Sequence, residues 1–296
     1  MKISELFKKG EMVITAEVGP PKGCHPDHLI HEADEFLKGV TAINVTDSQS
    51  SKMRMGSLAT CKGLKDAGHE AIFQLTCRDR NRIALQADLL SAAYFGIDNL
   101  LLLTGDHPTV GDNPQAKPVF DLDSVSLLHA VGELERGVDM GGNELELDGE
   151  PPKFCKGAVV SACSDSVDVQ LAKMERKIAA GAEYFQTQAV YDSEKFIKFM
   201  EKANQFGVPV MLGLIIPKNV GQVNYMNNNI AGISVPPEII EELKADKEKT
   251  KAGITGVEIT ARIIKECKDY CQGIHIMALG WESKVPEIMK LSGLKA

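Results

Sequence analysis

This sequence contains few aromatic residues and no excess of positive charge. Of its 296 residues one is tryptophan, and Phe, Trp and Tyr together account for 5%. Sugar-binding sites use aromatic rings for stacking, so this composition argues against a glycosidase. The formal net charge is −8, from 33 basic and 41 acidic residues. Nucleic-acid surfaces depend on an excess of Lys and Arg, so we expect no nucleic-acid partner.

Long apolar runs and metal-binding motifs are also missing. No run of about 18 apolar residues occurs, so no membrane span is expected. The first 17 residues lack the apolar centre of a signal peptide. Seven cysteines include no C-x-x-C pair, and seven histidines include no H-E-x-x-H or H-x-x-x-H motif. The sequence therefore predicts a cytoplasmic protein with free thiols and no metal centre.

Eight short β-rich runs alternate with segments of helical period. The runs occupy residues 12–18, 41–47, 70–77, 99–106, 156–163, 183–191, 209–216 and 273–280. Eight strand–helix units in a chain of this length favour a closed (β/α)8 TIM barrel. An open doubly wound sheet is the alternative, but the glycine-rich turn that normally follows its first strand is absent.

We expect one domain over residues 1–296, with an insertion at about residues 137–154. This insertion is rich in Gly and Pro, and its segment 142–149 is predicted to form a small hairpin. A second irregularity follows Pro237, where a charged helix breaks near Asp246 and a longer helix continues to Gln272.

In a barrel of this type the chemistry gathers where the strands end. Glu17 stands in an otherwise apolar run, where a buried carboxylate costs several kcal/mol unless it is paired or protonated. Asp106 follows four consecutive leucines and does not start a helix. We therefore interpret these two carboxylates as functional. No Ser or Cys nucleophile with a nearby His is evident, which argues against acyl transfer. The other polar residues at strand ends are Thr46, Asp47, Ser48, Gln74, Thr76, Thr104, Ser161, Gln186 and Gln188.

Four motifs appear in register along the chain. They are "EVGPP" at 17–21, "QLTC" at 74–77, "GDHP" at 105–108 and "ERKIAAGAEYFQTQ" at 175–188. In their order and spacing they resemble the methylenetetrahydrofolate reductase family. Its members are flavin-dependent (β/α)8 barrels that reduce 5,10-methylenetetrahydrofolate to 5-methyltetrahydrofolate. The chain is similar to short bacterial members without a regulatory domain, of the kind expected in acetogenic bacteria.

This resemblance implies a role for particular residues. Glu17 corresponds to the general acid, Asp106 to a carboxylate beside flavin and pterin, and Gln188 to a residue that binds the pterin. In the implied reaction a reduced flavin gives a hydride to the one-carbon unit, Glu17 protonates the leaving nitrogen, and Asp106 stabilises the cation. Position 74 is often His in the family and is Gln here. The implied flavin contacts are Thr46, Gln74, Thr104, Gly105, Asp106, Arg176 and Lys177.

The resemblance leaves the cofactor and its electron donor open. The flavin is FAD or FMN, with FAD preferred. The eighth strand ends in "MALGWE", at 277–282, where many nicotinamide-using members have an L-N-R-like ending. The donor is therefore NADH or a companion electron-transfer subunit, and an oligomer is compatible with either. Trp281 either narrows the space for a nicotinamide or packs under a neighbouring loop. The alternatives are a barrel specific for another pterin and a non-catalytic flavin- or folate-binding subunit of a redox complex.

Overall fold

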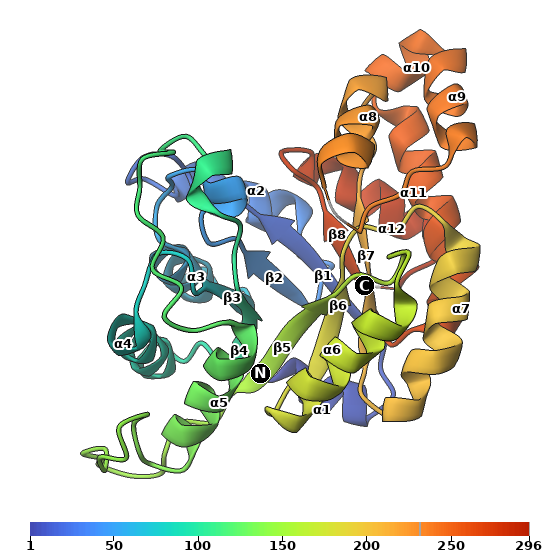
Figure 1. The fold of residues 1–296 in the computed structure, drawn as a ribbon. Coiled ribbons are helices and arrows are strands. Elements are labelled where there is room, and N and C mark those ends of the chain that lie inside the picture. Colours follow the sequence, from blue (N-terminus) through green and yellow to red (C-terminus); the bar gives the residue numbers. More distant parts are fainter. Residues whose placement is uncertain (231, 296) are drawn as a thin grey trace.

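Eight parallel strands close into a barrel in chain order (Figure 1). The computed structural model describes residues 1–230 and 232–295. The predicted (β/α)8 barrel is confirmed, and pairing of β1 with β8 excludes the open sheet. The strands are β1 (Val13–Val18), β2 (Ala42–Val45), β3 (Ala71–Thr76), β4 (Asn99–Leu103), β5 (Cys155–Val160), β6 (Tyr184–Thr187), β7 (Val210–Ile215) and β8 (Gly273–Met277).

Helices surround this barrel, and α8, α9 and α10 rise beyond the carboxyl ends of the strands (Figure 1). The predicted break at Asp246 is confirmed, since it separates α9 from α10. The single long helix predicted from there to Gln272 is wrong: Gly253, with φ of 80°, separates α10 from α11, and α11 ends at Cys267. None of the helices in the described ranges is long and apolar enough to cross a membrane. The helices are α1 (Ile3–Lys8), α2 (Asp27–Phe36), α3 (Ser57–Asp66), α4 (Arg82–Tyr94), α5 (Ser124–Glu135), α6 (Val167–Ala179), α7 (Ser193–Ala203), α8 (Val220–Asn229), α9 (Pro237–Ala245), α10 (Lys247–Lys251), α11 (Ile254–Cys267) and α12 (Val285–Ser292).

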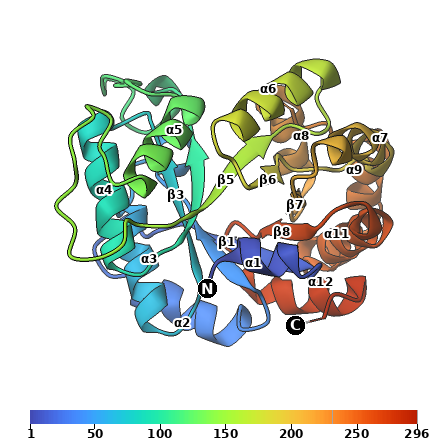
Figure 2. The ribbon, with the colours of Figure 1, turned by 90° about the horizontal axis from the view of Figure 1, so that it is seen from below.

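The lower part of the barrel interior is an apolar plug. Side chains that point inward from the first residues of the strands pack against α1, which lies across this opening (Figure 2). Because side chains alternate along a strand, the inward set recurs every second residue. The plug consists of Ile3, Val13, Ala42, Ile72, Leu101, Cys155, Tyr184 and Met211.

One step higher, the inward-pointing residues are polar. Asn44 and Gln186 exchange hydrogen bonds across the barrel at 2.9 and 3.2 Å. Thr15 and His275 are joined at 2.8 Å. All four are at most 3% exposed, and their pairing with one another satisfies polar groups that burial would otherwise destabilise. The barrel therefore changes from apolar to polar toward the carboxyl ends of the strands.

Gly157 on β5 is required by the packing of the plug. A Cβ at this position would lie 2.2 Å from Cζ of Tyr184, whose hydroxyl donates to the carbonyl of Leu100 at 2.9 Å. We expect Gly157→Ala to lower the free energy of unfolding by about 2–3 kcal/mol, because overpacking displaces a buried ring. Gly132→Ala in α5 is the control. No heavy atom lies within 4 Å of a Cβ built at Gly132, so this substitution is expected to raise the free energy of unfolding by about 0.5–1 kcal/mol. Urea unfolding of both variants tests this; equal effects would contradict it.

The insertion at residues 137–154 lies beyond the end of α5, on the side where the strands begin (Figure 1). The hairpin predicted for 142–149 is wrong. The bridge in this segment joins Val138 to Glu144, so the turn spans 139–143. The carboxylate of Asp139 accepts from the amides of Gly141 and Asn143 at 2.8 and 2.9 Å. The turn, held by side-chain-to-backbone hydrogen bonds, therefore lies a few residues before the glycine-bounded segment 142–149 in which it was predicted.

Candidate active site

A cavity of about 380 Å³ opens at the carboxyl ends of the strands. This volume lies in the range of small-molecule sites. Its floor is the polar layer, represented by Gln186 and His275. The structure brings eight of the nine predicted site residues into the wall of this one cavity: Glu17, Thr46, Gln74, Thr104, Gly105, Asp106, Lys177 and Gln188.

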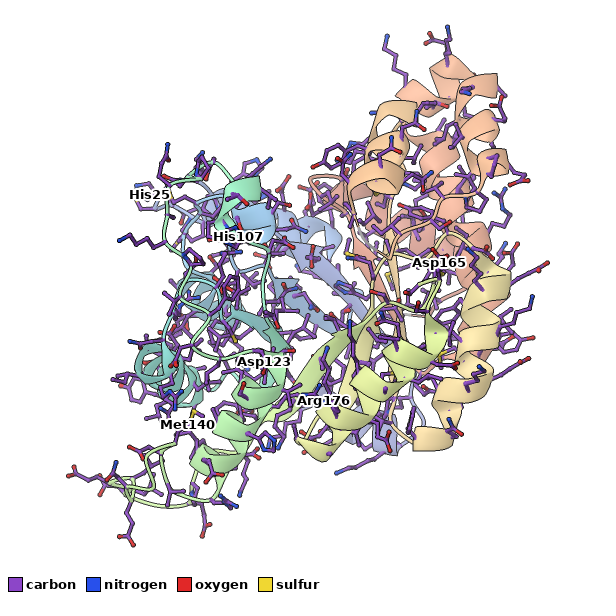
Figure 3. The ribbon with its side chains drawn as sticks, viewed as in Figure 1. His25, His107, Asp123, Met140, Asp165 and Arg176 are labelled. Carbon is purple, nitrogen blue, oxygen red and sulfur yellow. The ribbon has the colours of Figure 1, made fainter. Side chains whose placement is uncertain are left out.

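Arg176 is the exception. It lines an adjoining pocket of about 260 Å³ that shares Thr104, Ser124 and Lys177 with the main cavity. This second pocket lies where the first turn of α5 faces α6, so Asp123 and Arg176 lie near each other (Figure 3). The two pockets thus form a polar chamber with a basic side arm.

Glu17 lies in the barrel mouth, in the wall of the main cavity. Its position follows from the strand period, because Thr15 and Glu17 point inward from β1. The carboxylate is 7% exposed and accepts hydrogen bonds from the side-chain amides of Gln74 at 3.0 Å and Gln49 at 3.2 Å. The burial expected from the sequence is confirmed, and two neutral amides hold this carboxylate in one orientation.

Behind Glu17 lies a histidine that the sequence analysis did not identify. Nε2 of His275 is 3.6 Å from Oε2 of Glu17, and Nδ1 of the same ring is 2.8 Å from the hydroxyl of Thr15. His275 is 3% exposed. The sequence could have indicated His275 only through its inward position on β8, opposite Thr15. That position becomes evident only once β1 is known to pair with β8 and close the barrel.

Asp47, directly after β2, is a buried acceptor for the next loop. Its Oδ2 accepts from the amide and hydroxyl of Thr76 at 2.9 and 2.8 Å and from Nη1 of Arg80 at 2.7 Å. Nη2 of Arg80 donates to Oδ1 at 3.2 Å. Arg80 also pairs with Asp88 of α4 at 2.9 Å. The sequence placed Asp47 at a strand end, but not as the anchor of the β3–α4 loop.

The segment after β2 is conformationally strained. Ser48, Ser50 and Ser51 all have positive φ, at 48°, 55° and 54°. Such conformations cost about 1–3 kcal/mol each and concentrate at functional sites. The strain places Gln49 over Glu17 and lets the Ser51 hydroxyl donate to the carbonyl of Asp106 at 2.9 Å. The loops that follow β2 and β4 are thereby joined by a hydrogen bond at the cavity mouth.

Asp106 lies in the second of these loops. It follows Gly105, whose φ is +93°, and its side chain is exposed. A Cβ on Gly105 would lie 3.1 Å from Cβ of Thr76 and 3.2 Å from Cβ of Arg78, so glycine allows the loop to approach β3. Asp106 is therefore an exposed carboxylate at the rim of the cavity, whereas Glu17 is a buried carboxylate in its wall.

The basic side arm contains Lys173, Arg176 and Lys177. Nζ of Lys177 donates to the carbonyl of Val159 at 2.7 Å. Burial, followed by repulsion from Lys173, lowers the pKa of Lys177 to about 8, and Asp123 opposes this shift. Three cations beside the first turn of a helix form a site suited to an anion such as a phosphate.

The chamber fits a flavin in its donor set. Thr46 is among the residues that line the cavity, and its hydroxyl oxygen is buried with no hydrogen-bond partner among the described residues. A polar atom in that condition normally has a partner in the functional state. The amides of Gln74 and Gln188 can both donate and accept, as the edge of a flavin ring requires. The basic arm matches the phosphate of the same cofactor.

Trp281 does not narrow the cavity. Its ring lies under Nζ of Lys218, 4.9 Å from the ring centroid. A Cβ on Gly253 would lie 3.1 Å from the indole, so the ring packs against the start of α11. Of the two alternatives, packing under a neighbouring loop is the one observed.

Comparison with known proteins places the chain in a family. A family model described as methylenetetrahydrofolate reductase matches residues 2–293. Methylenetetrahydrofolate reductase 2 of Schizosaccharomyces pombe is 28% identical over 246 residues, covering 76% of this chain and 36% of the yeast protein. The 5,10-methylenetetrahydrofolate reductase of Escherichia coli K12 is 23% identical over 265 residues, covering 87% of this chain and 82% of that protein.

A similar solved structure is an uncharacterised protein from Clostridium thermocellum, described as binding two copies of 5-methyl-5,6,7,8-tetrahydrofolic acid. It matches with a TM-score of 0.66 at 14% identity, covering 99% of this chain and 100% of that one. At this identity the match shows a shared fold. The chain spans 36% and 50% of the lengths of its yeast and rice relatives. Because the family match extends over nearly the whole barrel, the chain belongs to the methylenetetrahydrofolate reductase family.

Proposed function

We propose that this chain reduces 5,10-methylenetetrahydrofolate to 5-methyltetrahydrofolate with a bound flavin. The observation that carries the proposal is Glu17, a buried carboxylate oriented by two amides at the mouth of the barrel. Family membership supports the reaction. The Clostridium thermocellum protein, which has the same fold, binds 5-methyl-5,6,7,8-tetrahydrofolic acid, the product proposed here.

Glu17 is the proposed general acid. Methylenetetrahydrofolate must open its five-membered ring before its one-carbon unit can accept a hydride, and the leaving nitrogen then needs a proton. Glu17 delivers that proton from a site shielded from water. Asp106 at the rim stabilises the cation that develops on the substrate. A reduced flavin, when bound, supplies the hydride.

Gln188 is the proposed pterin-binding residue. Its Oε1 accepts from the amide of Ala189 at 3.0 Å, which fixes the side chain and leaves its NH₂ group to donate into the cavity. Pterin rings present nitrogen and oxygen acceptors along one edge. An amide held in this way discriminates a pterin from an apolar ring of similar size.

We propose that the basic side arm binds the flavin phosphate, and that FAD is preferred over FMN. Thr46, Gln74, Thr104 and Gly105 are the proposed contacts in the main cavity, with Arg176 and Lys177 in the arm. Three cations and a separate pocket offer more anion-binding capacity than one phosphate needs.

The affinity for FMN is expected to fall as the pH rises through about 8. Lys177 loses its charge near that value, whereas a phosphate stays dianionic above about pH 7. Because the fraction of charged Lys177 falls about tenfold between about pH 7 and about pH 9, the dissociation constant is expected to rise by up to about tenfold over this range. Fluorescence titration measures it. Lys177→Met should flatten the profile, and riboflavin, which has no phosphate, should show none. The same slope for riboflavin would show that the phosphate is not the group that Lys177 binds.

The proposed electron donor is a companion flavoprotein or iron–sulfur subunit. The steric argument from Trp281 does not apply, because that ring packs away from the cavity. What supports the proposal is the end of β8, where Leu279 and Gly280 offer no polar side chain for a nicotinamide amide. We expect the isolated protein to turn over with reduced viologen and to react slowly with NADH. Flavin bleaching by NADH within milliseconds, at the rate of folate reduction, would contradict this.

One experiment separates the proposed reaction from its alternatives. The protein is loaded with FAD, reduced without oxygen, and mixed with methylenetetrahydrofolate while absorbance near 450 nm is recorded. Reoxidation with formation of 5-methyltetrahydrofolate supports the proposal. Reoxidation only by a different pterin would indicate another substrate. A protein that binds no flavin would support the non-catalytic alternative.

A further inference from the structure

Arg78 is a buried cation in the cavity wall to which the proposed function assigns no role. Its residue is 2% exposed, and it lines the main cavity. Arginine is almost never buried to this extent unless its charge is paired. The pairs that it makes therefore show what remains available to a ligand.

Two sides of the guanidinium are occupied. Nε donates to Oδ1 of Asp79 at 2.9 Å and Nη2 to Oδ2 of the same carboxylate at 2.6 Å. Nη2 also lies 3.5 Å from the carbonyl of Asp47, at the limit of a hydrogen bond. Nη1 donates to no residue in the described ranges, and it is not among the fully buried unpartnered atoms. Nη1 therefore keeps unpaired N–H groups on a residue that lines the cavity.

The neighbouring arginine behaves differently. Arg80, two residues along the same loop, uses its guanidinium to bridge Asp47 and Asp88. It does not line the cavity described above. Within one short loop, Arg80 therefore anchors the structure and Arg78 offers a free edge.

The position of Arg78 is fixed by the loop that follows β4. Its carbonyl accepts from the amide of Val119 at 2.8 Å, and its Cβ lies where a side chain on Gly105 would meet it. The partner carboxylate of Asp79 is 46% exposed, so water screens that pairing on its outer side. Arg78 itself is 2% exposed, so its charge is less screened by water than that of its partner.

We propose that Arg78 is an anion-binding residue of the cofactor site, whose free Nη1 edge meets negative charge on the bound flavin. This inference rests on the proposed function. The same chemistry has two sources in a flavin: the phosphate, and the pyrimidine edge of the ring, which is negatively charged after reduction. Both would accept a charge-assisted hydrogen bond from the guanidinium.

The test compares Arg78→Met with Arg82→Met. Arg82 lies in the same segment and pairs with Asp121 on the surface, so it is a matched control for the loss of one positive charge. Riboflavin, FMN and FAD are titrated into each apoprotein, and the midpoint potential of the bound flavin is measured. If the phosphate is the partner, Arg78→Met weakens FMN and FAD by about tenfold or more and leaves riboflavin unchanged.

If the ring edge is the partner, Arg78→Met lowers the two-electron potential of all three flavins. A tenfold loss of preference for the reduced form corresponds to about 30 mV. Asp79→Asn adds a test in which the affinity or the potential should change in the opposite direction. It leaves Arg78 in place and removes the competing carboxylate, so it should tighten phosphate binding or raise the potential. This variant alters a half-exposed side chain and covers the case in which Arg78→Met fails to fold.

The outcomes separate the two claims. A wild-type protein that binds none of the three flavins overturns the proposed function and this assignment with it. If the wild type binds flavin, and Arg78→Met matches Arg82→Met in affinity and potential, only the role of Arg78 is overturned. An Asp79→Asn variant that leaves both affinity and potential unchanged also overturns it.

Discussion

Glu17→Gln is expected to lower the rate of methylenetetrahydrofolate reduction by at least about a hundredfold, the scale of general acid catalysis. Glutamine keeps the shape of the side chain, and Gln49 and Gln74 can rotate their amides to satisfy it. The barrel and its flavin site should therefore persist. Stopped-flow measurement of the folate half-reaction gives the rate. Reduction of the bound flavin by viologen should be within about twofold of the wild type, because no proton from Glu17 is needed there.

A matched control distinguishes a specific acid from a general effect of charge. Glu32 lines a neighbouring cavity that also includes Glu17, and it pairs with His28 at 3.2 Å. Glu32→Gln removes one carboxylate charge from the same region and should leave turnover nearly unchanged. Equal losses in both variants would attribute the effect to local charge. Wild-type turnover in Glu17→Gln would assign the proton to another group.

His275 is part of the surroundings that the Glu17 carboxylate would lose in Glu17→Gln. Its ring lies against the carboxylate and is held from behind by Thr15. At 3.6 Å the ring is beyond hydrogen-bond distance of the carboxylate but close enough to pair with it electrostatically. Glu17 is therefore oriented by the hydrogen bonds from Gln49 and Gln74, with this ring beside it.

Asp47→Ala is expected to lower the free energy of unfolding by about 3 kcal/mol. The substitution removes the acceptor of four hydrogen bonds and leaves the guanidinium of Arg80 and the amide of Thr76 without that partner. Breaking a buried ion pair from one side costs about 3–5 kcal/mol, and the lower end applies because the Arg80 side chain is 23% exposed. Urea unfolding monitored by circular dichroism measures the change.

The control is an ion pair of the same type on the surface. Asp66 pairs with Lys62 one turn away on α3, with both side chains exposed. Asp66→Ala should change the free energy of unfolding by less than about 0.5 kcal/mol, because water screens such pairs. A loss in Asp47→Ala no larger than this would show that the β3–α4 loop does not depend on Asp47.

The architecture could be predicted because its signal is local and repeated. Apolar runs bounded by capped helices recur along the chain, and β4 with its four leucines is the clearest example. Positions at strand ends are equally local, so Glu17, Gln74 and Asp106 could be assigned to one end of the barrel. Their common cavity followed from the rule that parallel strands end on one side.

The features that escaped prediction depend on contacts distant in sequence. His275 reaches Glu17 only because β8 pairs with β1, a separation of 258 residues between the two side chains. The free edge of Arg78 depends on which partner each arginine of its loop takes. The hairpin failed for a different reason, since the side chain of Asp139 formed a turn that composition alone did not indicate. The position of the Trp281 ring could not be predicted because its neighbour Gly253, at the start of α11, is distant in sequence.

The central claim is that one buried carboxylate protonates a folate whose one-carbon unit a bound flavin reduces. The most direct measurement is the anaerobic reoxidation of reduced, FAD-loaded protein by methylenetetrahydrofolate, in the wild type and in Glu17→Gln. We predict that the wild type reoxidises within its turnover time and forms 5-methyltetrahydrofolate, and that the variant does so at least about a hundredfold more slowly. Equal rates in the two proteins, or no reoxidation in the wild type, would contradict the claim.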